Sequence, residues 1–329
     1  MSFQNCKIVQ VGADPTEYHK QVAKRGEAGF VVSSSPLRDF IHCPRRWING
    51  YESSDSKSTD WGSLIDCRFL TPDQFGARVA IQPPTYTNEK GEVKDWSNNA
   101  KKCKEWNEFH REAGHQIASV EDVNECDKAI QRLMDDPTIA RWHSDSDRQV
   151  WVAGEWKDEA TGIVVPCKCL LDYVPRASSE YFRCLGDFKS ARSAAPRGWS
   201  RHLYTYGYHI QGALNLDMFV AATQEDRQTW CWILQENYPP YEPGLEMMSE
   251  DFMAMGRATY QQAMGRYCRC LKSGQWPGYD AMNPDNLQGW SLAVPEVWMA
   301  FVEMSCSMEA QVDAEDAAKD DVPENDITP

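Results

Sequence analysis

The sequence predicts an α/β domain of the α+β kind, in which a mixed central sheet is flanked by helices. Two patterns predict this class. Apolar residues at helical spacing dominate the chain up to Trp142, and consecutive strand-like segments fill the stretch from Gln149 to Ala191. A strong helical pattern and one more strand follow, so helices precede and follow the strand region.

The helices of the first half have clear boundary signals. Ser33 followed by Pro36 is typical of a helix start, and Pro44 predicts a break soon afterwards. Residues 119–122 form a capping-box pattern ahead of a helix that runs to about residue 136. Further helices are expected at 60–70, at 101–112 with Trp106 and Phe109 facing inward, and at 137–142, whereas 80–100 is expected to be a loop.

The strand region is expected to contain Gln149–Trp156, Ile163–Val174 and Leu185–Ala191. The turn-rich stretch 175–180 predicts a hairpin between the last two, which would bring Asp172 close to Asp187. A helix at 203–219, a final core strand at 229–234 and a helix at 247–271 are expected next. In the first of these helices Tyr204, Tyr208, Gln211 and Asn215 are expected to share one face.

A chemical site is expected at this hairpin. Period-two geometry places Asp187 and Lys189 on the same face of their strand, beside Asp172. Two carboxylates and an ammonium suit a hard divalent cation and the charge of a phosphodiester. The alternative is an exposed ion pair without function. Asp66 is a further candidate, because an acid among apolar neighbours is costly unless it is paired or bound to a metal.

The overall composition limits the classes of function that the protein can have. The chain is 42% hydrophobic and 25% charged, with no apolar run long enough to span a membrane and no visible secretory signal. Its 12 cysteines are scattered, which indicates reduced thiols in a cytoplasm rather than a disulfide framework or an iron–sulfur cluster. The net charge of −15 disfavours nucleic-acid binding. A local basic cluster after Lys189 still leaves room for it, formed by Arg192, Arg197, Arg201 and His202.

Several stretches, in order, resemble the motifs of one nuclease family. They are Ser33–Leu37 with Cys43-Pro44, Trp61–Asp66, Leu70–Phe75, Thr161-Gly162, Leu171–Tyr173, Gly186–Lys189, Tyr206–Leu214 and Gln275–Tyr279. Together they resemble the PD-(D/E)XK nuclease superfamily, in particular its RecE-type branch of exonuclease VIII and phage relatives. The resemblance implies a restriction-endonuclease-like core. It places a nuclease domain at 33–305 with a helical extension from about 246, between an N-terminal segment (1–32) and an acidic disordered tail (306–329).

The resemblance also implies roles. Asp172 and Asp187 would bind Mg²⁺ or Mn²⁺ with the Phe188 carbonyl, Lys189 would stabilise the attacked phosphate, and Gln211 would position these groups. Asp66, a metal-ligand candidate, stands where the family usually has histidine, and Leu170 and Asn215 are further departures. The candidate DNA contacts are Arg192, Arg197, Arg201, Tyr204, Tyr208, Arg45 and Arg46.

The function implied is a metal-dependent exonuclease that digests linear double-stranded DNA 5′→3′ in a bacterial cytoplasm. It would leave 3′ single strands for a strand-annealing protein and would assemble as a homo-oligomeric ring, a trimer or tetramer, whose basic channel holds DNA inside an acidic exterior. One alternative is another PD-(D/E)XK nuclease, RecB-like or CRISPR-associated. The other is a non-catalytic DNA-binding or assembly module, which the departures at Asp66, Leu170 and Asn215 favour.

Overall fold

The computed structural model describes residues 2–50 and 57–279, and residues 1–277 form one compact unit. The expected end of the nuclease domain at 305 and the acidic tail at 306–329 lie outside the described residues. Within the described part, no helix is long and apolar enough to cross a membrane.

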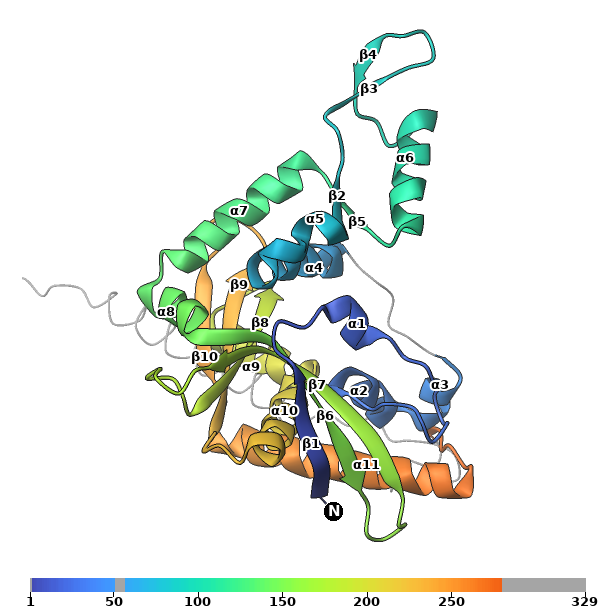
Figure 1. Cartoon of the computed structure of the whole chain (residues 1–329), viewed down its shortest axis with the longest axis vertical. Coiled ribbons are helices and arrows are strands. Elements are labelled where there is room, and N and C mark those ends of the chain that lie inside the picture. Colours follow the sequence, from blue (N-terminus) through green and yellow to red (C-terminus); the bar gives the residue numbers. More distant parts are fainter. Residues whose placement is uncertain (1, 51–56, 280–329) are drawn as a thin grey trace, which may run out of the picture. The chain divides into compact units, whose positions relative to one another are not determined.

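The core of the unit is a six-stranded mixed sheet in the order β1-β6-β7-β8-β9-β10 (Figure 1). All neighbours in it are antiparallel except β8 and β9, which run parallel. This confirms the predicted mixed sheet. Its strands are β1 (Ser2–Gln10), β6 (Ser146–Lys157), β7 (Val164–Pro175), β8 (Cys184–Ala191), β9 (Thr229–Glu236) and β10 (Pro243–Met247).

Helices cover both faces of this sheet, because side chains along its strands alternate between two apolar cores. On β9, Trp230 and Trp232 enter one core, whereas Cys231 and Ile233 enter the other. The first core contains buried residues of α2 (Ser34–His42), α3 (Pro44–Ile48), α9 (Pro196–Thr205), α10 (Tyr208–Thr223) and α11 (Glu250–Ser273). The second contains buried residues of α4 (Lys57–Leu70), α7 (Val120–Met134) and α8 (Pro137–Asp145).

Several predicted boundaries are confirmed. Ser33 is the N-cap of α2, which ends before Pro44, and Ser119 with Asp122 forms the complete capping box of α7. The prediction of one helix over 203–219 is wrong, because Gly207 takes the left-handed conformation (φ +64°) and separates α9 from α10. As a result Tyr204 does not continue the face that carries Gln211.

Two predictions for the stretch between α4 and α7 are also wrong. After η1 (Pro72–Gln74) and α5 (Phe75–Arg78), the expected loop contains strands of only three residues each, too short to show a pattern. They are β2 (Val79–Ile81), which pairs with β5 (Gln116–Ala118), and the hairpin of β3 (Thr85–Thr87) and β4 (Val93–Asp95). Phe109 on α6 (Lys101–Glu112) is 65% exposed rather than inward, because this helix buries Cys103 and Asn107 instead.

Two edge strands were not expected from the sequence. β1 lies at one edge against β6, and its exposed, irregular register with a positive φ at Asn5 explains why no period is visible. The short helix α1 (Pro15–His19) follows it. β10 extends the sheet beyond β9, which was expected to be the last core strand, and its mostly half-exposed residues give only a weak hydrophobic signal.

Candidate active site

The site lies where β7 and β8 separate. These strands pair at Tyr173 and Gly186, and no further β7–β8 pair follows. Two residues beyond Gly186, the backbone N–H of Phe188 donates instead to the carboxylate Oδ2 of Asp172 at 2.9 Å. Gly186 is required at the close approach, because a Cβ there would stand 2.8 Å from the ring of Trp142. At this point the backbone pairing of β7 with β8 ends, and the side chain of Asp172 makes the next hydrogen bond between the two strands.

A cavity of about 1150 Å³ opens beside this separation and collects the predicted catalytic residues. Asp172 comes from β7, Asp187 and Lys189 from β8, Asp66 from α4 and Gln211 from α10. Lys189 forms an ion pair with Asp187, and Gln211 Nε2 donates to Asp187 Oδ1 at 3.1 Å. The sequence prediction that these acids and the lysine lie together is borne out as geometry, whereas their roles stay predictions.

Crowded charge governs the protonation of the site. Burial, reinforced by Asp187, raises the pKa of Asp66 to about 7 although Lys189 opposes the shift. Burial first, and then the charge of Asp187, raise the pKa of Asp172 well above its usual range. Burial lowers the pKa of Lys189, but the carboxylates of Asp187 and Asp172 outweigh it and raise this pKa overall. Three carboxyl groups thus share one ammonium, and in the absence of a cation the raised pKa values of Asp66 and Asp172 favour their protonated forms.

This donor set suits a hard divalent cation. Carboxylate oxygens are the preferred ligands of Mg²⁺ and Mn²⁺, and a cation would offset both the burial and the mutual repulsion that raise the pKa values of Asp66 and Asp172. Among the described residues, no three His, Cys, Asp or Glu side chains already form a complete ligand group. Mg²⁺ usually keeps several waters and takes only one or two carboxylates, so the arrangement remains compatible with it. The role of the Phe188 carbonyl stays a prediction.

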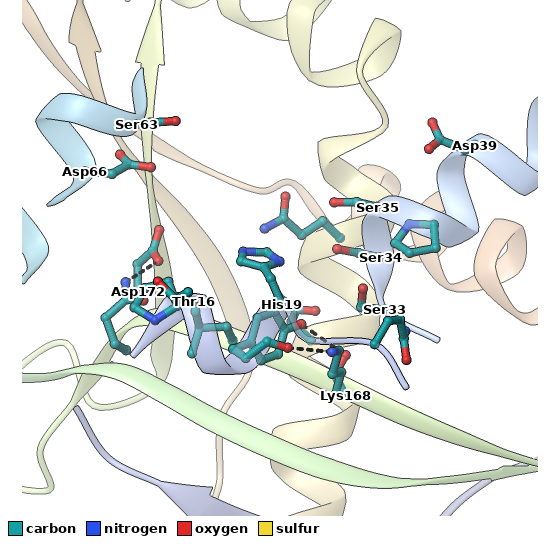
Figure 2. Close-up of a pocket in the computed structure, with 18 of the residues that line it drawn as sticks. Thr16, His19, Ser33, Ser34, Ser35, Asp39, Ser63, Asp66, Lys168 and Asp172 are labelled. Carbon is teal, nitrogen blue, oxygen red and sulfur yellow. Dashed lines mark hydrogen bonds between the residues drawn. The ribbon is translucent and has the colours of Figure 1, made fainter. Parts of the chain in front are cut away.

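The rest of the cavity wall includes a lysine, Lys168, that was missed from the sequence. Figure 2 shows Asp66 and Asp172 at one end of the cavity, Ser33 to Ser35 at the other, and His19 between them. Lys168 on β7 is buried and donates to the carbonyls of Tyr18 and Lys20 at 2.5 and 3.1 Å. It thereby fixes the end of α1 at the cavity. No local motif indicates this contact, because the two segments are distant in sequence.

A second missed residue supports the acids directly. Gln149 on β6 donates from its Nε2 to Asp172 Oδ1 at 2.9 Å, so both oxygens of this carboxylate hold hydrogen bonds within the protein. Gln149 has a positive φ of 51°, an unusual conformation for a strand residue. A cross-strand register, which the sequence did not supply, was needed to place it opposite Asp172.

The proposed DNA contacts lie outside the cavity wall. Arg45, Arg46, Arg192, Arg201 and Tyr204 are exposed and do not line it. Tyr208 does not line it either, but its ring centre is 5.3 Å from Lys189 Nζ. The side chain of Arg197 lies outside the described residues.

The three departures from the nuclease motifs all line the cavity. Asp66 stands among the acids, and Leu170 and Asn215 complete neighbouring parts of the wall. Asn215 is 2% exposed, and its Oδ1 has no hydrogen-bond partner in the part of the chain that the structure describes. A buried acceptor of this kind is costly, so a polar group bound in the cavity would satisfy it.

Fold and site together define a PDDEXK-like protein, and comparison with known proteins agrees. Residues 33–283 match the family model "PDDEXK-like domain of unknown function (DUF3799)", and the chain belongs to this family. A crystal structure from Eubacterium rectale described as a "Putative exonuclease" is similar, with a TM-score of 0.48 and 16% sequence identity over 82% of this chain and 92% of that chain. No curated protein matches the sequence.

Proposed function

We propose that the protein is a metal-dependent DNA exonuclease. The observation that supports this best is the convergence of Asp172, Asp187, Lys189 and Gln211 in one cavity at the strand separation. A divalent ion bound by the carboxylates would polarise the scissile phosphodiester and lower the pKa of a bound water. Lys189 supplies positive charge where the phosphate gains negative charge, and Gln211 holds Asp187 in place.

The finer parts of the proposal come from the resemblance to RecE-type enzymes. They are 5′→3′ polarity on linear duplex ends, a 3′ single-stranded product for an annealing protein, and a trimeric or tetrameric ring. The eleven described cysteines are all free thiols, which supports a reducing compartment such as the bacterial cytoplasm. Arg192, Arg201, Arg45 and Arg46 are exposed and would contact phosphates outside the cavity.

The test uses the full-length protein with Mg²⁺ or Mn²⁺ and duplex DNA labelled at either 5′ or 3′ ends. Release of mononucleotides from linear but not circular duplex is expected, with loss of the 5′ label first. Wild-type protein that releases no nucleotides in either metal would overturn the nuclease proposal. Cleavage of circles or of single strands alone would instead favour another PD-(D/E)XK activity. Metal-independent DNA binding without cleavage would favour a binding module, the alternative suggested by Asp66, Leu170 and Asn215.

A further inference from the structure

A row of aromatic rings leads from the catalytic lysine candidate to the surface. Tyr208, the first residue of α10, lies with its ring centre 5.3 Å from Lys189 Nζ and stacks on buried Trp199 at 5.4 Å and 16°. The Tyr206 ring follows at 5.8 Å from Tyr208, and the His202 ring at 5.8 Å from Tyr206. The row therefore begins beside a residue that lines the cavity and ends outside it.

The second tyrosine of this row, Tyr206, is exposed although its backbone is held in place. Tyr206 is 57% exposed, but Arg38 donates from Nη1 to its carbonyl oxygen at 2.5 Å. Gly207 lets the Arg38 side chain approach, since a Cβ there would lie 3.0 Å from Arg38 Cδ. The Tyr206 backbone is thus fixed between two helices. Because the backbone is already fixed, only the side-chain torsions of this solvent-facing ring lose entropy when a flat ligand stacks on it.

Positive charge accompanies the rings. The Arg38 guanidinium lies 5.5 Å from the centre of the Tyr208 ring, and its Nη2 donates to Ser35 Oγ at 3.2 Å. Lys189 lines the cavity, and Arg38 contacts Ser35, which also lines it, so one cation beside the aromatic row lies in the cavity wall and a second lies directly behind that wall. Flat rings next to cations are the arrangement that binds bases and phosphates of a single strand.

We propose that Tyr206, with Tyr208 and Arg38, forms a stacking platform for unpaired DNA bases next to the cavity. This inference rests on the proposed nuclease function. A base pair inside a duplex offers only its edges, whereas an unpaired base offers a face to Tyr206 and its phosphate to Arg38. The ligand class is therefore single-stranded DNA, a strand separated at the duplex end where cleavage takes place.

The experiment measures binding of fluorescein-labelled dT12 by anisotropy in EDTA, where no metal-dependent cleavage consumes the probe. Tyr206→Ala should weaken binding by about 5- to 150-fold, the range of one lost base stack. Tyr206→Trp should bind as well as wild type or better, and Tyr206→Leu, which keeps apolar bulk without an aromatic face, should resemble Tyr206→Ala. Tyr238→Ala removes a comparably exposed tyrosine (46%) that lies between β9 and β10, outside the aromatic row, and this variant should bind dT12 as wild type does.

A second probe separates stacking from a structural role. An abasic 12-mer keeps the phosphates but offers no base, so wild type and Tyr206→Ala should bind it equally. dT12 affinity unchanged in Tyr206→Ala would overturn the platform, as would an equal loss for the abasic strand. A blunt duplex that depends on Tyr206 as strongly as dT12 would overturn the single-strand assignment. Failure of the nuclease proposal is seen separately, as absence of Mg²⁺-dependent nucleotide release by wild type.

Discussion

The two sides of β7 differ in how they are paired. Towards β6, backbone pairing runs from Ser146–Pro175 to Lys157–Val164. Towards β8, it consists of the single pair Tyr173–Gly186. On the second side a side chain replaces the ladder, because Asp172 accepts the Phe188 N–H.

This difference shows how a sheet can hold acids that repel one another. The β6 side provides rigidity and an anchoring amide from Gln149, while the open side gives Asp172 and Asp187 room to face a common cavity. Continuous pairing on both sides would have used the backbone groups that Asp172 now contacts. The candidate site therefore lies on the side of β7 where pairing with β8 ends, and the side paired with β6 supports it.

The largest effect is expected from removing charge where the pairing of β7 with β8 ends. Asp187→Asn should reduce Mg²⁺-dependent nucleotide release by about 10³-fold or more, since metal-assisted catalysis depends on several kcal/mol of charge stabilisation. Asp147→Asn is the matched control, because this partly exposed acid on β6 pairs with Arg176 and does not line the cavity. Equal activity of Asp187→Asn and wild type in a nuclease assay would contradict the assignment.

The next effect concerns the single β7–β8 pair. Gly186→Ala should destabilise the protein by about 1–3 kcal/mol, because its Cβ would stand 2.8 Å from Trp142 and 3.3 Å from the Cβ of Tyr173. Gly76→Ala on α5 is the control, since a Cβ there meets nothing within 4 Å. Urea unfolding measures both variants. Equal midpoints would show that this approach tolerates a side chain.

A smaller effect is expected in the pH dependence of stability. The pKa of Asp66 is raised to about 7, so the folded metal-free protein binds this proton more tightly than the unfolded chain does. The stabilisation that this proton gives the folded protein is fully present below the pKa of Asp66 in the unfolded chain. It is lost as the pH rises through about 7. Asp66→Asn should remove that decline and stabilise the metal-free protein at pH 8 by about 2 kcal/mol, a value reduced for solvent access to the cavity.

Thermal unfolding in EDTA at pH 5 and pH 8 measures this change, and Mg²⁺ provides its counterpart. Because Asp66 and Asp172 must lose protons to bind a cation, added Mg²⁺ should stabilise wild type more at pH 8 than at pH 6. Identical pH profiles for wild type and Asp66→Asn would rule out this carboxyl as the cause.

The smallest effect is expected from a substitution on β6, the strand that pairs continuously with β7. Gln149→Leu removes the amide that holds Asp172 and should weaken Mn²⁺ binding by about 10-fold, the lower end for a residue that supports a metal ligand. Calorimetric titration measures the affinity, with Gln131→Leu, at an exposed position of α7, as the control. Unchanged affinity would show that the Phe188 N–H alone fixes Asp172.

Much of the fold could be predicted because its signals are local. The capping box at Ser119, the break at Pro44 and the shared face of Asp187 and Lys189 on β8 each depend on neighbouring residues. The features that were predicted wrongly depend on a backbone conformation or a packing partner that the local sequence pattern does not reveal. The helix break at Gly207 needs a positive φ, and Phe109 is exposed because α6 packs through other residues.

The sequence by itself determined which charged residues meet at the candidate site. Asp172, Asp187 and Lys189 stand on predicted strands, where period-two geometry and a hairpin bring them together. Tertiary structure alone decided that Gln149 and Lys168 support the cavity and that Tyr206 is held at its edge by Arg38. The reason is physical: these contacts join segments separated by about 20 to 170 residues, and only the folded sheet and helices bring such segments together.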